Sequence, residues 1–153
     1  MTTWIPPESF LFEITSASPE ETVALGKRIA RRLVPGSVVA LRGGLGAGKT
    51  CLAKGIARGL GVEEEVNSPT YTIISEYETK EKKPFYHIDA YRLKDDEDFE
   101  ALGGRDLFYG GGIAVVEWSE KIPNSLPEDS VLVEIEILDG EKRRFRVTGI
   151  CTL

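Results

Sequence analysis

A glycine-rich run in the first third of the chain has the residue types and the spacing that hold phosphate groups in proteins. Residues 43–50 read GGLGAGKT and fit the pattern G-x-x-x-x-G-K-[S/T]. Glycines let the backbone N–H groups of such a loop converge on phosphate oxygens at the start of a helix, where the helix dipole also favours an anion. We therefore expect the whole loop to bind phosphate through Gly43, Gly44, Leu45, Gly46, Ala47, Gly48, Lys49 and Thr50.

The last two residues of the loop make the expected ligand more specific. Lys49 would contact the β and γ phosphates of a nucleotide and act in catalysis, and Thr50 supplies a hydroxyl ligand for Mg²⁺. The flanking sequence agrees, because an apolar run at 38–41 precedes the loop and an amphipathic stretch at 49–60 follows it. A strand, a loop and a helix in this order predict a site for a nucleoside triphosphate with its metal ion.

A triphosphate site with Mg²⁺ also needs a carboxylate, which usually stands at the end of a hydrophobic strand beside the strand that enters the loop. Glu117 directly follows the apolar run 113–116, and Asp89 ends an expected strand within HIDAYR at 87–92. Both carboxylates would reach the carboxyl edge of the sheet, where such folds bind their ligands. We expect Glu117 to hold the metal together with Thr50, while Asp89 competes for that role or orients the attacking water.

Four other positions near these motifs have a functional interpretation and a structural one. Trp118, in an alternating strand, would point to the side opposite the preceding glutamate, where it could stack on adenine or cover the core. Thr70 could sense the γ phosphate and the metal in a switch, or it could belong to a proline turn that enters a strand. Arg92 could neutralise charge on the γ phosphate or form a surface ion pair. His87 is interpreted as a structural hydrogen-bonding residue.

The overall composition limits the classes of protein to consider. The chain has 153 residues, of which 41% are hydrophobic and 29% are charged, which suits a single domain over 1–153. A net charge of −6 and a sequence pI near 5.0 argue against free-standing binding to DNA or RNA, which needs a basic face. There is no signal-peptide pattern and no run of about 20 apolar residues to span a membrane. Cys51 and Cys151 lack the spacing of a metal site, and we expect a cytoplasmic protein that does not contact a membrane.

Strands and helices alternate along the chain. Ser18 begins a capping box with Pro19 at the first helical position, Gly61 suits the left-handed end of the helix after the loop, and Asp139-Gly140 is a strong hairpin signal. The expected strands are 10–15, 38–41, 70–77, 85–89, 113–116, 131–138 and 143–148, and the expected helices are 19–33, 49–60 and 95–102. This order predicts an α/β fold, a compact phosphate-loop NTPase-like architecture with a mixed parallel and antiparallel sheet.

Four motifs in a fixed order give the chain a family resemblance. They are GGLGAGKT at 43–50, SPTYT at 68–72, HIDAYRL at 87–93 and VVEW at 115–118. The segment from Ser18 to Trp118 strongly resembles the TsaE family, also called YjeE. Members of that family are bacterial ATPases required for the threonylcarbamoyl modification on adenosine 37 of tRNAs that read codons beginning with A. They act with the TsaD and TsaB proteins.

The resemblance implies an activity and a role for each motif. It implies that the chain hydrolyses Mg-ATP as an accessory subunit, slowly without TsaD-like and TsaB-like partners, and meets tRNA indirectly through their assembly. The implied roles are Lys49 on the phosphates, Thr50 and Glu117 on Mg²⁺, Thr70 in a switch loop, Asp89 near the hydrolytic water and Trp118 near the base. Many members carry an acidic residue where this chain has Gly44.

Two other classes of protein use such a loop and stay open at this point. A small-molecule kinase would need an acceptor pocket and a closing lid with arginines. Arg92 and Arg105 are the candidates in the middle of the chain, and the sequence has no evident lid insertion. A GTPase-like switch would normally carry an N/T-K-x-D motif that reads guanine, and the nearest string, TKEK at 79–82, ends in lysine. The residues therefore favour ATP over GTP.

Overall fold

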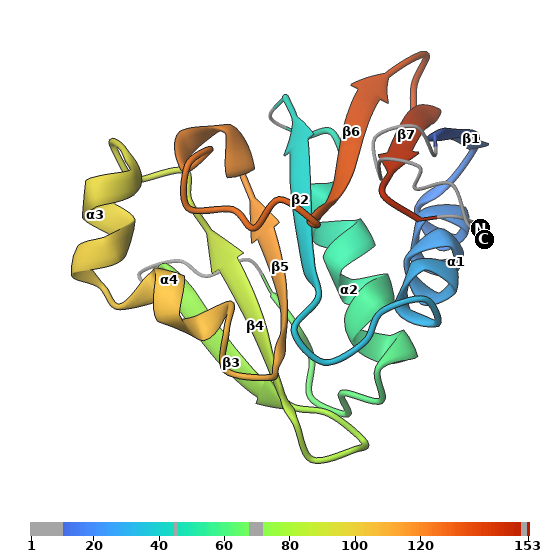
Figure 1. The fold of residues 1–153 in the computed structure, drawn as a ribbon. Helices are drawn as coiled ribbons and strands as arrows, with labels where there is room; N and C mark the ends of the chain where they lie inside the picture. Colours follow the sequence, from blue (N-terminus) through green and yellow to red (C-terminus); the bar gives the residue numbers. More distant parts are fainter. Residues whose placement is uncertain (1–10, 45, 68–71, 151–152) are drawn as a thin grey trace, which may run out of the picture.

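The computed structural model describes residues 11–44, 46–67, 72–150 and 153, and it is built around one seven-stranded sheet (Figure 1). The strands are β1 (Leu11–Ser16), β2 (Val38–Gly43), β3 (Ile74–Glu78), β4 (Pro84–Asp89), β5 (Ile113–Glu117), β6 (Val131–Ile137) and β7 (Arg143–Thr148). The helices are α1 (Pro19–Ala30), α2 (Lys49–Gly59), α3 (Asp96–Ala101) and α4 (Gly104–Leu107), with a short 3₁₀ helix η2 (Ser119–Lys121).

The order of the strands in the sheet is β1-β7-β6-β2-β5-β4-β3. The four central strands, β6, β2, β5 and β4, run parallel to one another. At the two sides, β7 pairs antiparallel with β6 and β1, and β3 pairs antiparallel with β4. The mixed sheet that the sequence predicted is confirmed, and its parallel centre brings the carboxyl ends of β2, β5 and β4 to one edge.

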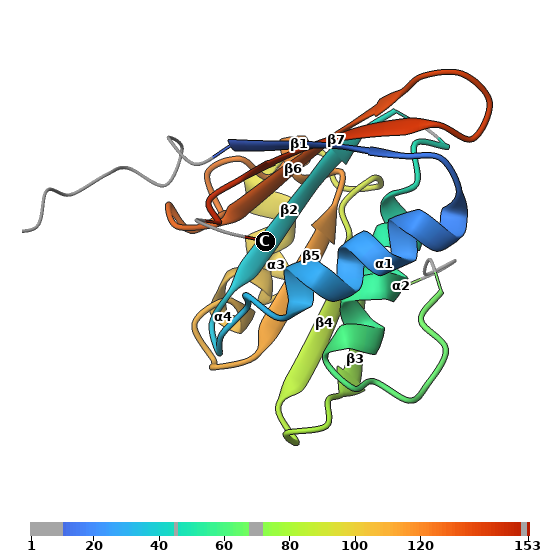
Figure 2. The same ribbon diagram turned by 90° about the vertical axis from the view of Figure 1, so that its right-hand side faces the viewer.

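Both faces of the sheet are covered, which explains why its central strands are continuous apolar runs. On β2 the side chains alternate, so that Val39 joins the core cluster beneath α1 and α2, while Val38 joins a second cluster with Phe99 and Phe108 from the region of α3 and α4. Figures 1 and 2 show α1 and α2 packed on one face, with α3 and α4 on the other side of the molecule.

The phosphate-loop helix α2 is held very close to α1 by glycines. A Cβ added at Gly55 would lie 2.3 Å from the carbonyl oxygen of Val23, and one added at Gly26 would lie 2.6 Å from the carbonyl oxygen of Leu52. Real Cβ atoms do not come this close to backbone atoms, so the two helix backbones can approach only where side chains are missing. This packing fixes the direction in which α2 leaves the loop.

The helix boundaries agree with the sequence at the start of α1 and differ at its end. The Ser18 side chain caps the helix by accepting the backbone N–H of Glu21 at 3.2 Å, as the capping box predicted. The helix ends at Ala30 and does not continue to Leu33. Beyond it the backbone forms a tighter turn, in which Leu33 N–H donates to the carbonyl oxygen of Ala30 at 3.1 Å. A helix could not continue much further, because Val34 directly precedes Pro35 and the residue before a proline disfavours the helical conformation.

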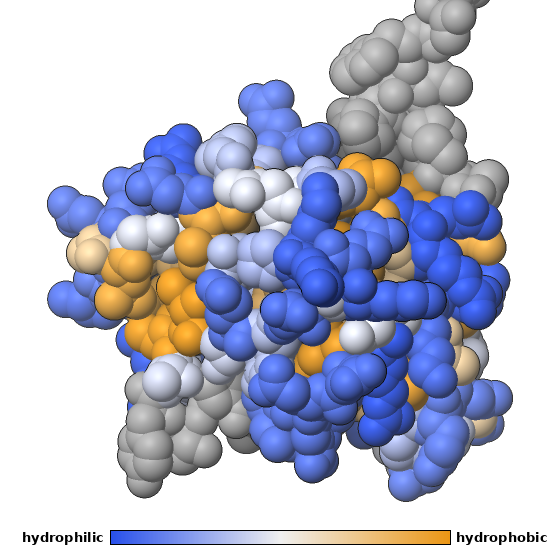
Figure 3. All heavy atoms as spheres, turned by 90° about the horizontal axis from the view of Figure 1, so that it is seen from below, coloured by the Kyte–Doolittle hydropathy of each residue, from blue (hydrophilic) through white to orange (hydrophobic). Residues whose placement is uncertain are grey.

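The edge of the sheet opposite the phosphate loop faces the viewer in Figure 3, where polar and charged side chains surround smaller apolar patches. Val34 and Tyr109 are among the exposed large hydrophobic residues of the described chain, with 62% and 68% of their surfaces exposed. Within the described ranges, no helix has both the length and the apolar character that a membrane crossing requires.

The helix contact yields a test of the fold. We expect Gly55→Ala to lower the free energy of unfolding by about 1 to 3 kcal/mol, because the new methyl group must push against the α1 backbone and the core relaxes poorly. Urea unfolding measures this change. Gly110→Ala is the matched control, since its Cβ would meet the nearest atom at an ordinary 3.6 Å. A Gly55→Ala variant as stable as wild type would show that α1 and α2 are not held this closely.

Candidate nucleotide-binding site

The phosphate loop joins the carboxyl end of β2 to the amino end of α2, as the sequence predicted. Gly46 and Gly48 have φ angles of 76° and 105°, which residues with a side chain rarely adopt. Gly48 is also the N-cap of α2, and as a glycine it has no side chain with which to cap the helix. The amino end of a helix suits an anion, because backbone N–H groups point out of it and the helix dipole favours negative charge.

A cleft of about 360 Å³ lies beside the loop, within the range of small-ligand sites. It is lined by residues 46–51 and by Asp89, Tyr91, Glu117 and Trp118. Asp89 pairs with Glu117 across the parallel strands β4 and β5, so both side chains arrive at the same edge of the sheet. The structure thus brings the loop together with both carboxylates that the sequence singled out.

Lys49 is buried in the loop, with 5% of its surface exposed. Its Nζ donates hydrogen bonds to the carbonyl oxygens of Gly43 (2.6 Å) and Gly44 (2.7 Å), and it lies 4.0 Å from the centroid of the Trp118 ring. Burial lowers the pKa of this ammonium group, while the nearby carboxylate of Glu117 acts in the opposite direction. A partly desolvated cation held by neutral oxygens is well suited to bind an anion, because a phosphate oxygen is a stronger partner than a carbonyl.

Glu117 ends β5 and is almost completely buried, with 3% of its surface exposed. Its carboxylate accepts a hydrogen bond from the Thr50 hydroxyl, with distances of 3.0 Å to Oε1 and 3.2 Å to Oε2. Thr50 and Glu117 are the residues expected to hold Mg²⁺, and their oxygen atoms lie side by side. Mg²⁺ fits such a pair, because it usually takes one or two protein oxygens and completes its shell with phosphate and water.

The described residues contain no group of three or more His, Cys, Asp and Glu side chains arranged to hold a metal ion. Thr50 and Glu117 would supply one hydroxyl oxygen and one carboxylate to a cation, and Mg²⁺ is usually bound by one or two carboxylates together with phosphates and water.

His87 explains how the Glu117 carboxylate is held in a buried position. The imidazole is fully buried on β4, and its Nε2 forms a hydrogen bond with Oε2 of Glu117. Because an ionised carboxylate only accepts hydrogen bonds, Nε2 is the donor in this contact, while Nδ1 is buried without a hydrogen-bond partner among the described residues. The structural role expected for His87 agrees with this geometry, and its partner is a residue of the candidate metal site.

Asp89 lies beside Glu117 but makes a different contact. Its Oδ1 accepts a hydrogen bond from the backbone N–H of Tyr91 at 3.0 Å. Because the Thr50 hydroxyl bonds to Glu117, the geometry favours Glu117 for the metal. The role of Asp89 beside the hydrolytic water stays a prediction.

Trp118 does not continue the alternation of β5, and the expectation that it points away from Glu117 was wrong. Its backbone turns into the left-handed region, with φ 59°, directly after the strand ends. The indole therefore lines the same cleft as Glu117, over Lys49 and next to Tyr91, with the two ring centroids 5.0 Å apart. Its ring contacts Lys49, the residue expected to meet the β and γ phosphates, and stacking on adenine stays a prediction.

Leu45, Thr70 and Arg92 are three further residues that the sequence singled out. Leu45 and Thr70 lie outside the described residues. Arg92 is exposed and is not among the residues that line the cleft. A residue that sequence reasoning missed, Arg143, instead contacts the loop from β7 through hydrogen bonds to Gly46 and Ala47.

The fold and the site define an α/β protein of the phosphate-loop class, in which a glycine-rich loop joins a parallel strand to a helix. Comparison with known proteins narrows this class. Residues 16–145 match the family model of the threonylcarbamoyl adenosine biosynthesis protein TsaE, and the chain belongs to this family.

Individual relatives cover most of the chain. The tRNA threonylcarbamoyladenosine biosynthesis protein TsaE of Treponema pallidum is 42% identical over 132 residues, which are 86% of this chain and 96% of the relative. The protein of the same name from Bacillus subtilis is 42% identical over 135 residues, 88% of this chain and 84% of the relative. The crystal structure of Bacillus subtilis YdiB matches with a TM-score of 0.74 and 34% identity, covering 92% of this chain and 86% of YdiB.

The contact between Thr50 and Glu117 predicts a specific metal phenotype. We expect Glu117→Ala to raise the Mg²⁺ concentration needed for nucleotide binding, because it removes the buried carboxylate next to the Thr50 hydroxyl. Titrating Mg²⁺ at a fixed ATP concentration measures this requirement. Glu120→Ala removes an exposed carboxylate that also acts on Lys49 and serves as the control. An unchanged Mg²⁺ dependence in Glu117→Ala would move the metal role to Asp89.

The contact between Trp118 and Lys49 predicts a fluorescence signal. The chain has two tryptophans, so that Trp4→Phe leaves Trp118 as the single emitter. Mg-ATP should change this emission, because a phosphate group competes for the Lys49 ammonium that lies against the ring. In Trp118→Phe the signal should be lost. A response that survives in Trp118→Phe and vanishes in Trp4→Phe would contradict this placement.

Proposed function

We propose that this chain is a Mg-dependent ATPase and a cytoplasmic accessory subunit of the bacterial machinery that makes N6-threonylcarbamoyladenosine at position 37 of tRNA. The relatives are named for the biosynthesis of this nucleoside, and the family match supports a role in the same pathway. The enzymatic part of the proposal rests on one observation. The Thr50 hydroxyl lies against the buried Glu117 carboxylate, directly beside the buried Lys49 ammonium.

Each part of this arrangement has a task in hydrolysis. The backbone N–H groups at the start of α2 and the Lys49 ammonium hold the phosphates, and Thr50 and Glu117 hold Mg²⁺. Mg²⁺, when bound, neutralises the charge that develops on the β and γ oxygens. His87 keeps the Glu117 carboxylate in place, and Asp89 orients the attacking water from the neighbouring strand. The charges of Lys49 and Glu117 are already in place in the folded chain, so they need not reorganise during the reaction.

The chain is expected to turn over slowly by itself and to depend on TsaD-like and TsaB-like partners. The cleft is bordered by the exposed side chain of Tyr91, 55% of whose surface is accessible. An open site of this kind excludes water poorly, which weakens the electrostatic contacts that stabilise the transition state. The net charge of −6 also disfavours direct binding to RNA, so we expect the chain to contact tRNA only indirectly, through the assembly.

Reconstituted tRNA modification tests this proposal. With threonine, bicarbonate, ATP, tRNA and the partner proteins, repeated turnover should require this chain. Lys49→Ala should no longer sustain repeated turnover, because losing a desolvated, charge-assisted contact with phosphate costs roughly 2 to 5 kcal/mol of binding free energy. Lys54→Ala is the control, because Lys54 lies five residues further along α2 and does not line the cleft. Equal turnover without the chain, or with Lys49→Ala, would show that the proposed function is wrong.

The fate of the γ phosphate separates hydrolysis from phosphoryl transfer in the same reaction. With ATP labelled at the γ position, we expect free phosphate as the product. Asp89→Ala should still bind ATP but release little phosphate, since Asp89 is assigned to water positioning and not to the phosphate grip. A labelled acceptor molecule in place of free phosphate would support a small-molecule kinase instead.

A further inference from the structure

The topology of the sheet places Arg143, the first residue of β7, beside the phosphate loop. β6 runs parallel to β2 and pairs Ile135 with Gly43, the residue that opens the loop. The hairpin between β6 and β7 therefore extends beside the loop at the same edge of the sheet. Arg143 follows this hairpin directly.

The guanidinium group of Arg143 uses all of its nitrogens on backbone carbonyls. Its Nε donates to the carbonyl oxygen of Ala47 (3.1 Å) and Nη2 to that of Gly46 (3.3 Å), both in the phosphate loop. Its Nη1 donates to the carbonyl oxygens of Gly140 (2.6 Å) and Lys142 (2.9 Å) in its own hairpin. The planar fork of an arginine can bridge two such segments, whereas a lysine offers a single point of attachment.

These bonds set the direction of the loop peptides. In a trans peptide the carbonyl and the N–H point in opposite directions, and the described chain has no cis peptide bond. When Arg143 holds the carbonyl of Ala47, the N–H of Gly48 is turned away from the arginine. Gly48 lines the cleft and Arg143 does not. The arginine thus fixes one side of the loop and presents N–H groups on the other.

We propose that Arg143 is a positioning residue of the nucleotide site, which clamps the phosphate loop to the β6–β7 hairpin so that the loop N–H groups are ready for phosphate. This inference rests on the proposed function, because it assigns the loop to a nucleotide. The guanidinium acts through the loop backbone. Its loss should weaken ADP and ATP alike, because the loop grips phosphates that both nucleotides share.

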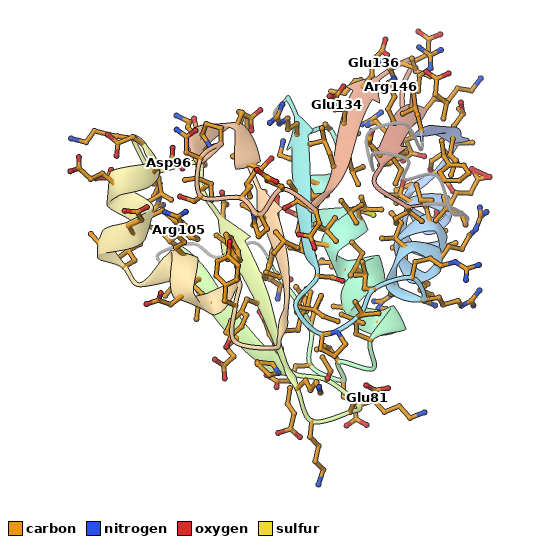
Figure 4. All side chains as sticks on the ribbon, in the orientation of Figure 1. Glu81, Asp96, Arg105, Glu134, Glu136 and Arg146 are labelled. Atoms are coloured by element: carbon orange, nitrogen blue, oxygen red, sulfur yellow. The ribbon has the colours of Figure 1, made fainter. Side chains whose placement is uncertain are left out.

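Arg146 provides a matched control on the same strand. Side chains alternate along β7, so that Arg143 shares a face with the buried Phe145 and Val147, while Arg146 lies on the opposite face. Arg146 forms an exposed ion pair with Glu13 on β1, with an N–O distance of 3.4 Å. Figure 4 labels Arg146 on β7 together with Glu134 and Glu136 on the neighbouring strand β6. Such exposed pairs contribute little to stability.

The test compares Arg143→Gln, Arg143→Lys and Arg146→Gln by equilibrium binding of ADP and ATP with Mg²⁺. We expect Arg143→Gln to weaken both nucleotides by about tenfold or more, since several bonds from a charged donor are lost. Arg143→Lys should recover only part of this loss, and Arg146→Gln should bind as wild type does. The loss in Arg143→Gln should appear mainly as a higher ATP concentration for half-maximal turnover, because Arg143 acts through the loop backbone and does not line the cleft. Wild-type affinity in a folded Arg143→Gln variant would overturn the inference.

Hydrogen exchange separates this inference from the proposed function. Backbone amides in the segment 46–50 should exchange faster in Arg143→Gln than in wild type without nucleotide, while amides of α1 should be unchanged. If the wild-type chain bound no nucleotide, the proposed function would fail, and the exchange rates would still decide whether Arg143 holds the loop. Unchanged exchange in the segment would contradict the clamp. If Arg143→Gln does not fold, the same measurements are made on Arg143→Lys.

Discussion

The buried ammonium group of Lys49 is the feature on which the rest of the site depends. Burial lowers its pKa, so the charged form must be compensated by its surroundings. In the structure the compensation comes from the carbonyl oxygens of Gly43 and Gly44, the face of Trp118 and the nearby Glu117. A phosphate group satisfies such a cation better than neutral oxygens do. The loop is thus built around a cation that a phosphate group would satisfy better than its present carbonyl partners do.

The sheet provides this arrangement through its order of strands. β2 delivers the loop, and its neighbour β5 delivers Glu117 to the same edge. Beyond β5, the strand β4 supplies both Asp89 at the edge and His87 beneath it. These parts could be predicted from the sequence where the signal is local. The loop motif, the apolar run before Glu117 and the capping box of Ser18 each depend on a few neighbouring residues, and all three lie where the sequence predicted.

The parts that could not be predicted depend on contacts between distant residues or on single backbone turns. The alternation of β5 fails at Trp118 because one residue adopts a left-handed conformation, which a tryptophan does rarely. The partner of His87 lies on the next strand, so its identity depends on register. Arg143 lies 96 and 97 positions along the chain from its two partners in the loop, and the parallel pairing of β6 with β2 brings them together.

A crystal structure of the chain with Mg²⁺ and a non-hydrolysable ATP analogue is the most direct measurement. The phosphates should lie along the loop, with Lys49 Nζ moved from the carbonyl oxygens of Gly43 and Gly44 to the β and γ phosphates. Mg²⁺ should contact the Thr50 hydroxyl, with the Glu117 carboxylate beside it. A nucleotide bound elsewhere, with Lys49 still on the loop carbonyls, would contradict a function based on this cleft.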